Sequence, residues 1–384
     1  MPEFQQLPPL SLYIHIPWCV RKCPYCDFNS HTVDELPEQQ YIQELINDLE
    51  QQLPSIWGRR IVSVFIGGGT PSLFSGDSIR QLTTAIKARL NCLPAMEITL
   101  EDNPGTVEQQ RFDAYVEAGV NRLSIGVQSF NSQHLKSLGR IHTNEEAQHA
   151  IEAGRSAGFE NINLDLMFGL PDQSIEQGLE DLQQAIALQP QHISWYQLTI
   201  EPNTLFYKQP PPLPEDDLIS DLQEQGQALL AQHGYQQYEI SAYAQQGKRC
   251  RHNLNYWEFG DYLAIGAGAH GKISSAQDGS IRRYWQQRQP NAYLQASHKT
   301  SGEQWLTRAD RVYEFMLNAL RLKQGIELSL FSQHTGLKDH ELHAGLNKAR
   351  ELELITEDQQ RLIPTDMGYR FLNNLINCFH PEHD

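Results

Sequence analysis

Three cysteines within eight residues constrain this chain more than any other feature. Cys19, Cys23 and Cys26 follow the spacing C-x3-C-x2-C inside the stretch Y-I-H-I-P-W-C-V-R-K-C-P-Y-C-D-F-N-S, residues 13–30. Thiolates this close in sequence do not easily bridge one another, but they can converge on one soft metal centre. An iron–sulfur cluster usually takes four cysteines, and no fourth follows here. A cluster held by three would keep one iron open for a ligand that is not protein.

A structural zinc site is the alternative interpretation of the same three cysteines. His15 or His31 would be the nearest fourth ligand. Zinc sites usually show two separated pairs of cysteine or histidine, and no such pairs are visible in this stretch. The spacing therefore favours an iron–sulfur cluster.

The position of the cysteines also predicts where the metal lies in the fold. The apolar run Leu12–Ile16 precedes them and predicts a strand, and Pro17 and Pro24 interrupt regular structure on either side of the first cysteine pair. The cysteines then occupy a loop at the C-terminal end of a first strand. That edge of a parallel α/β sheet is where ligands bind.

Strands and helices alternate through the first two thirds of the chain. The predicted strands are Leu12–Ile16, Ile61–Ile66, Met96–Leu100, Arg122–Val127, Asn161–Met167 and His192–Ile200. The predicted helices are Glu38–Leu53, Ile79–Leu90 with Asp77 or Ser78 as its N-cap, Val107–Ala118, Ser132–Leu138, Asn144–Ala157 and Ser174–Leu188. Alternation of this kind gives parallel βαβ units, and eight units close a TIM barrel. Six units predict an α/β fold with an incomplete, TIM-like (β/α)6 barrel.

Two further regions follow the predicted barrel, which we place at residues 1–235. Residues 236–304 begin with a predicted strand, Gln236–Ala244, and are rich in glycine and aromatic residues. Residues 305–384 predict a mainly helical, winged-helix-like domain, with helices Val312–Leu322, Leu328–Thr335, His340–Ala349 and Thr365–Leu375 and a strand–turn–strand at Leu354–Ile355 and Arg361–Ile363. A winged helix commonly binds DNA. This one holds nine basic and twelve acidic residues, which argues against DNA.

The overall charge limits the partners that we expect for the chain, and the scattered cysteines indicate its compartment. The chain carries 30 basic and 47 acidic residues, a net charge of −17, which opposes nucleic acid. Cys92, Cys250 and Cys378 suggest no disulfide framework, so we expect a reducing, cytoplasmic setting. No run approaches the roughly 18 apolar residues of a membrane span. Peripheral membrane contact and a homodimer both stay open.

Polar residues stand near the C-terminal ends of several predicted strands. The run Gly67-Gly68-Gly69-Thr70 follows the second strand, where we expect the backbone to approach a ligand closely and expose N–H groups. Glu101, Gln128 and Asp165 interrupt or follow three further apolar strands. Polar groups are rarely buried without partners, so their convergence at one barrel mouth predicts a ligand with ribose hydroxyls and an ammonium group. Arg140, beyond the fourth strand, could bind a carboxylate.

These motifs together resemble the radical S-adenosylmethionine (SAM) superfamily. E-x-N-P (101–104), G-V-Q-S-F (126–130) and N-L-D-L-M-F-G-L-P (163–171) are similar to its oxygen-independent coproporphyrinogen oxidase branch, from about Pro9 to the C-terminus. The resemblance implies a radical SAM barrel with a [4Fe–4S] cluster on Cys19, Cys23 and Cys26, whose open iron chelates SAM. It implies a SAM site at Tyr13, Tyr25, Gly68, Gly69, Thr70, Glu101, Gln128, Arg140 and Asp165.

Two functions stay open within that branch. The oxidases carry a further cysteine two positions after the third cluster ligand, where this chain has Phe28. His252-Asn253-Leu254-Asn255-Tyr256-Trp257 is similar to the H-N-x-x-Y-W motif of the branch's heme-chaperone members. The resemblance therefore implies a chaperone that binds heme, with His252 as iron ligand, and passes it to acceptor hemoproteins. The alternative is oxidative decarboxylation of coproporphyrinogen III to protoporphyrinogen IX, so enzymatic activity is unsettled. His270, in a glycine-rich turn, either lines the same pocket or only shapes the turn.

Overall fold

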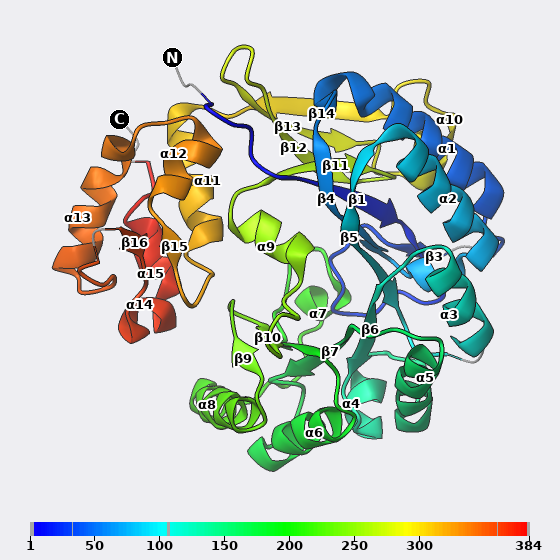
Figure 1. Ribbon diagram of the computed structural model, residues 1–384. Coiled ribbons are helices and arrows are strands. Elements are labelled where there is room, and N and C mark those ends of the chain that lie inside the picture. The colour runs from blue at the N-terminus through cyan, green and yellow to red at the C-terminus, as the bar shows by residue number, and fades with distance from the viewer. Residues whose placement is uncertain (1–3, 33, 106–107, 359, 382–384) are drawn as a thin grey trace.

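Six parallel strands form the centre of the fold, in the order in which the chain makes them (Figure 1). The computed structural model describes residues 4–32, 34–105, 108–358 and 360–381. The strands are β1 (Leu10–Ile16), β4 (Arg60–Gly68), β5 (Asn91–Asp102), β6 (Arg122–Gln128), β7 (Ile162–Phe168) and β8 (His192–Gln197). Each pairs in parallel with the next. The predicted α/β fold with an incomplete barrel is confirmed.

The two faces of the sheet differ in polarity. In β1 the leucines and isoleucines belong to the main apolar core, and the residues between them are Ser11, Tyr13 and His15. Side chains alternate between the faces of a strand, so one face is apolar and the other polar. Helices cover the outer face (Figure 1): α1 (Glu38–Gln52), α2 (Gly76–Arg89), α3 (Glu108–Glu117), α4 (Ser132–Ser137), α5 (Asn144–Ser156), α6 (Ile175–Ala187) and α8 (Asp216–Gln232). The inner face is therefore available for chemistry.

Of the predicted helix starts, one differs from the structure and one lies outside the described residues. Helix α2 begins at Gly76, three residues before the predicted start, and its N-cap is Ser75, whose hydroxyl accepts the Ser78 N–H. The prediction of Asp77 or Ser78 as N-cap is therefore wrong, because the first turn already contains both. The predicted first residue of the third helix, Val107, lies outside the described residues.

The edge of the barrel beside β1 carries four strands that the sequence did not predict. β11 (Asp261–Ile265) pairs in parallel with β1, and β12 (His270–Ser274), β13 (Ile281–Gln286) and β14 (Thr300–Trp305) follow in antiparallel order. At the other edge, Gln236–Ala244 is not one strand. It forms the short strands β9 (Gln236–Gln237) and β10 (Ala242–Ala244), which pair with each other, and β10 also pairs with β8. Residues 236–304 thus extend both edges of one twelve-stranded sheet.

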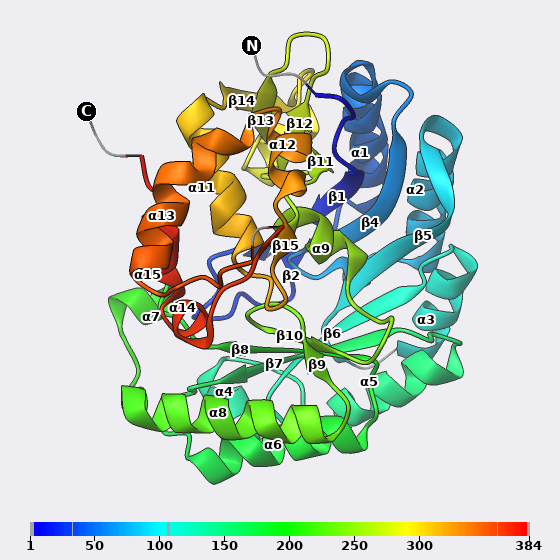
Figure 2. The same ribbon diagram turned by 60° about the vertical axis from the view of Figure 1, so that its left-hand side comes forward.

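The C-terminal region forms a separate group of helices (Figure 2). It packs around an apolar core that includes Phe315, Phe331 and Leu375. Its helices are α11 (Arg308–Ala319), α12 (Ser329–Thr335), α13 (His343–Glu351), α14 (Asp366–Arg370) and α15 (Leu372–Asn377). The predicted strand–turn–strand is present only in part. Ile355 meets Pro364 in a single antiparallel bridge, whereas β16 (Arg361–Leu362) pairs with β15 (Ile326–Glu327) instead. The predicted last helix is divided at Phe371, which has a non-helical backbone. We propose residue 305 as the boundary of this domain.

A buried ion network joins β11 to β12 and to the loop before β4. Asp261 is fully buried, and its carboxylate accepts from Lys272 Nζ (2.8 Å) and Arg59 Nη1 (2.7 Å). Lys272 is itself only 1% exposed, so it depends on Asp261 for its charge partner. The added strands are therefore fixed by an ionic contact that water does not screen.

Asp261→Ala should destabilise the protein by about 3–5 kcal/mol, because it leaves a buried ammonium without its partner. The measurement is the shift of the urea unfolding midpoint. Glu303→Ala is the matched control, since it removes the exposed partner of Arg282 and should cost only about 0–1 kcal/mol. Equal shifts in the two variants would contradict the importance of the buried network.

Candidate functional site

The carboxyl ends of the parallel strands bring most of the predicted site residues to one cavity of ≈ 130 Å³. The three cysteines line it together with Tyr25, Gly68, Gly69, Thr70, Glu101, Gln128, Arg140 and Asp165. Tyr13 is not among the lining residues, because its ring stacks on Phe65 with centroids 6.4 Å apart. Residues up to 146 positions apart in the sequence thus lie together at one edge of the sheet, where the parallel strands end. Their role as ligands of a bound molecule stays a prediction.

A tight loop presents the three cysteines to this cavity. The short strands β2 (Trp18–Cys19) and β3 (His31–Thr32) close the loop, and the Cys26 N–H donates to the Cys23 carbonyl (3.2 Å). Burial raises the pKa of Cys19 and of Cys26, and the neighbouring thiolates raise both further. A cationic metal centre would stabilise the thiolates of Cys19 and Cys26 against this effect, and it could bind all three sulfur atoms together. The donor set therefore fits an iron–sulfur cluster.

The two nearest histidines are engaged in hydrogen bonds rather than facing the cysteines. His15 Nε2 donates to the Asn29 carbonyl (2.9 Å), and its Nδ1 therefore accepts from the Tyr13 hydroxyl (2.9 Å). His31 Nε2 is bonded to Asn29 Oδ1 (3.1 Å). Both ring nitrogens of His15 and one ring nitrogen of His31 are already in hydrogen bonds and are not available to bind zinc. These contacts therefore favour the cluster over the zinc alternative.

The glycine turn at the end of β4 is fixed against β1 and the cysteine loop. Its N–H groups donate to protein acceptors: Gly68 to the Glu101 carboxylate (3.0 Å), Gly69 to the Ile16 carbonyl (2.6 Å) and Thr70 to the Trp18 carbonyl (2.7 Å). A Cβ at Gly69 would lie 2.5 Å from the Trp18 oxygen, so this position requires glycine. The prediction that the turn exposes its N–H groups to a ligand is wrong. The turn can instead offer carbonyl oxygens, which suit an ammonium group.

Two carboxylates face the cavity from β5 and β7, the strands on either side of β6. Burial, followed by the nearby Asp165 carboxylate, raises the pKa of Glu101 to about 8. Burial also raises the pKa of Asp165, although Ser124 Oγ (3.1 Å) and Asn163 Nδ2 (2.8 Å) donate to it. Two buried carboxylates with raised pKa values need positive charge or hydroxyl donors from a ligand. This is the chemistry expected where a cationic, ribose-bearing molecule binds.

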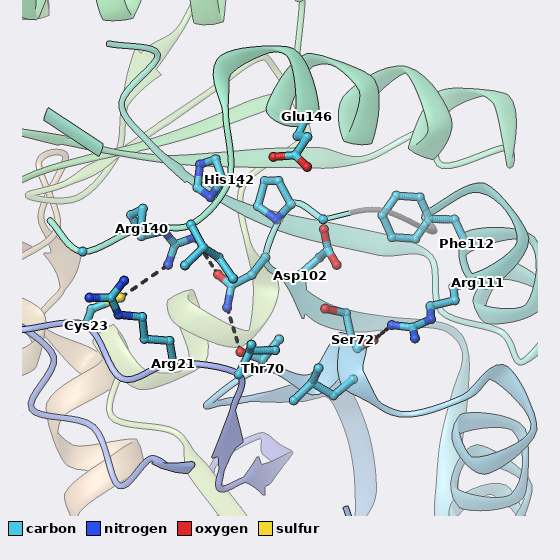
Figure 3. A pocket seen from close by; sticks show the side chains of 17 residues that line it. Arg21, Cys23, Thr70, Ser72, Asp102, Arg111, Phe112, Arg140, His142 and Glu146 are labelled. Carbon is cyan, nitrogen blue, oxygen red and sulfur yellow. Dashed lines mark hydrogen bonds between the residues drawn. The ribbon is translucent and has the colours of Figure 1, made fainter. Parts of the chain in front are cut away.

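Arg140 stands between this cavity and a second, larger one of ≈ 350 Å³ (Figure 3). Its Nη2 donates to Asn103 Oδ1 (2.8 Å) and to the Gly126 carbonyl, and its Nη1 lies 3.9 Å from Cys23 Sγ. Asn103 in turn donates to Thr70 Oγ1 (2.8 Å). A guanidinium held beside a cluster cysteine fits a carboxylate that approaches the open iron.

Gln128 has an unusual backbone conformation. Tyr196, which donates a hydrogen bond to its side chain, was not predicted from the sequence. The φ of Gln128 is 68°, at a register shift between β6 and β7, and its Oε1 accepts from the Tyr196 hydroxyl (2.7 Å). Left-handed backbone at a residue other than glycine persists where the surroundings require it, often at functional sites. Tyr196 and Asn103 both line the cavity. Signals for both existed, since Tyr196 lies within a predicted strand and Asn103 is a polar member of E-x-N-P.

The H-N-L-N-Y-W stretch forms a short helix, α9 (Arg251–Trp257), inside the ring of strands (Figures 1 and 2). Glu97 Oε1 accepts the N–H groups of its first two residues (3.0 and 3.3 Å). His252 is 1% exposed, with Nδ1 3.1 Å from Ser63 Oγ and Nε2 3.1 Å from the Tyr256 hydroxyl. An iron ligand needs a free ring nitrogen and room for the macrocycle. This geometry therefore argues against the predicted role of His252 as heme ligand.

Comparison with known proteins agrees with the family that the sequence motifs resemble. The sequence pattern of the Radical SAM superfamily matches residues 13–185, and that of the HemN C-terminal domain matches residues 306–371. The chain is 50% identical to "Heme chaperone HemW" of Haemophilus influenzae (98% of this chain, 99% of the relative) and 32% identical to "Heme chaperone HemW" of Bacillus subtilis (97% and 99%). The solved structure of coproporphyrinogen III oxidase (HemN) from Escherichia coli, described as a radical SAM enzyme, is similar in fold: TM-score 0.82, 24% identity, 98% of this chain and 91% of that chain.

Cys23→Ala should abolish assembly of a [4Fe–4S] cluster, because two thiolates cannot replace the three-cysteine donor set. The measurement is iron and acid-labile sulfide per chain after anaerobic reconstitution. Cys92→Ala is the matched control, since Cys92 lies at the start of β5, away from the cavity, and should keep full loading. A full cluster in Cys23→Ala would overturn the assignment.

Arg140→Ala should weaken SAM binding to the reconstituted protein by about 1.5–3 kcal/mol, the range for a hydrogen bond to a charged group. Isothermal calorimetry gives the affinity, and Asp165→Ala should also weaken it. Arg155→Ala serves as control, because this exposed arginine on α5 bonds the distant Leu188 carbonyl. Unchanged affinity in both Arg140→Ala and Asp165→Ala would remove these residues from the site.

Proposed function

Because the chain belongs to the radical SAM superfamily, and within it to the HemW family of heme chaperones, we propose that it binds heme and transfers it to acceptor hemoproteins. The observation that supports this most directly is 50% identity to a protein named a heme chaperone over nearly the whole of both chains. Radical SAM proteins carry a [4Fe–4S] cluster and SAM, and the cavity at the strand ends has the donors for both.

Different residues of the cavity would hold the cluster and SAM. Cys19, Cys23 and Cys26 would hold the cluster, which leaves one iron open to SAM and supplies an electron when reduced. Arg140 would bind the SAM carboxylate as a charge-assisted pair. The carbonyl oxygens of the glycine turn would accept from the SAM ammonium group.

The two buried carboxylates would complete the SAM site by charge and by hydrogen bonding. SAM carries a sulfonium and an ammonium, so its positive charge complements Glu101 and Asp165, whose pKa values burial raises. Carboxylate oxygens also accept from ribose hydroxyls. Gln128, held by Tyr196, adds an amide at the same edge.

One residue separates this proposal from the oxidase alternative. Phe28 lines the cysteine cavity and is 63% exposed, at the position where the oxidases carry a further cysteine. A phenyl ring has no proton or electron to give to a tetrapyrrole in the cavity. The likeness to the oxidase structure, at 24% identity, concerns the fold alone. We therefore propose a chaperone without coproporphyrinogen activity.

The setting of the protein is part of the same proposal. Free thiols and a cysteine-held cluster suit a reducing cytoplasm. In the part of the chain that the structure describes, no helix has both the length and the apolar character that crossing a bilayer needs.

The function is tested by comparing two activities of one reconstituted preparation. Wild-type protein should bind about one heme per chain in a spectroscopic titration and should then transfer it to an apo-hemoprotein. The same preparation, supplied anaerobically with SAM, a reductant and coproporphyrinogen III, should form no protoporphyrinogen IX.

Cys23→Ala serves as the matched variant, because it removes the cluster and leaves the rest of the chain unchanged. It separates heme binding from any later step that needs the cluster. If wild type binds no heme and converts coproporphyrinogen III, the chaperone proposal is wrong and the oxidase alternative replaces it.

A further inference from the structure

A second histidine has the free nitrogen and the exposure that His252 lacks. His270 begins β12, directly after the Gly266–Gly268 turn, and its side chain is exposed. Among the described residues, no hydrogen bond to either of its ring nitrogens is found. The imidazole is therefore available to bind iron without breaking an existing contact.

An aromatic ring lies beside this imidazole. Trp285 of β13 is the cross-strand partner of His270, with ring centroids 6.1 Å apart and planes 27° from parallel. On the next strand, a Cβ at Gly302 would collide with the indole of Trp285, so glycine there leaves the ring room to lie flat. A partly exposed indole next to an axial ligand offers an apolar surface to a porphyrin face.

Two cations act on the same position in a chain whose net charge is −17: Arg288, and Arg283, which is also paired with Glu314. Burial, and then the cations Arg283 and Arg288, lower the pKa of His270, so its imidazole is neutral at pH 7 and keeps a lone pair for a metal. Arg288 is exposed. Burial, and then Lys22 and Arg288, lower the pKa of His31. Arginine and lysine near one another on a surface suit the two propionate groups of heme.

The cysteine loop is attached to this surface. Asn29 Nδ2 donates to the carbonyl oxygens of Ala267 (2.9 Å) and Arg288 (2.8 Å). A Cβ at Gly268 would collide with the Asn29 amide, so only glycine allows this close approach. Phe28, the neighbour of Asn29, is exposed. The apolar side chain that replaces the oxidase cysteine thus lies next to the loop that bonds the turn before His270.

We propose that heme binds on the face formed by His270, Trp285, Arg288 and Phe28, with His270 as the iron ligand. This inference rests on the proposed chaperone function and names its binding site. The imidazole supplies the axial bond, the two aromatic side chains contact the macrocycle, and Arg288 pairs with a propionate. The site adjoins the cysteine loop. His270 and Trp285 do not line the cavity at the strand ends, and Phe28, which does, marks where the heme face and that cavity meet.

The test is a heme titration, followed in the Soret region, of wild type and three histidine variants of the full chain. His270→Ala should bind heme at least tenfold more weakly and lose the histidine-ligated spectrum, and added imidazole should restore that spectrum. His252→Ala should keep the wild-type spectrum. His298→Ala is the matched control, because His298 is also an exposed histidine of the same region and should change nothing.

The outcomes separate this inference from the function on which it rests. If wild type binds no heme, the proposed function fails and the site fails with it. If wild type binds heme and His270→Ala keeps both affinity and spectrum, the chaperone stands and the His270 site is wrong. Loss of the spectrum in His252→Ala, with His270→Ala unchanged, would return the ligand to α9. Weaker binding in Trp285→Ala and Arg288→Ala would support the orientation of the bound heme.

Discussion

The buried cation Arg122 offsets negative charge on the inner face of the barrel. Its guanidinium is attracted by Glu97 and Asp165, and it lowers the pKa values of Glu101 and Asp165 against the effect of burial. Unpaired charges are costly in such surroundings, so Arg122 supports these carboxylates in addition to the hydrogen bonds that they accept. Glu97 also caps α9. The cavity at the strand ends and the helix with the H-N-L-N-Y-W motif are thus parts of one polar core.

Hydrogen bonds extend that core without a break from the cavity to α9. Asp165 accepts from Asn163, whose carbonyl oxygen accepts from His192 (2.5 Å), and the Tyr238 hydroxyl bonds the other His192 nitrogen (2.8 Å). The Cys250 N–H then donates to that hydroxyl. Buried networks of this kind rigidify a fold when every member is satisfied. This explains why His252 sits inside the barrel: its helix completes the polar interior, and its burial follows from that role.

The sequence predicted the part of the fold that depends on local periodicity. Runs such as Ile61–Ile66 are apolar enough to identify the parallel strands, and the strand-edge rule brought Glu101 and Asp165 to one cavity. What it missed depends on distant partners. β11 is a short run between two glycines whose strand character comes from pairing with β1, some 250 residues earlier. Likewise, the contact of His252 with Ser63 has no local signal.

Whether a heme binds in a buried cavity or on an exposed face affects which function this fold can support. The cavity at the strand ends measures ≈ 130 Å³, far below the roughly 300–1,000 Å³ of pockets that enclose drug-sized ligands, and α9 occupies the barrel interior beneath it. The cavity that the three cysteines line therefore has little room for a porphyrin, and the adjoining cavity of ≈ 350 Å³ beside Arg140 is at the lower end of that range. A heme on the face around His270 would instead stay accessible to an acceptor, whose own ligand could approach the iron before the His270 bond breaks. Exposure, which would be a defect in an oxidase site, is what transfer between proteins requires.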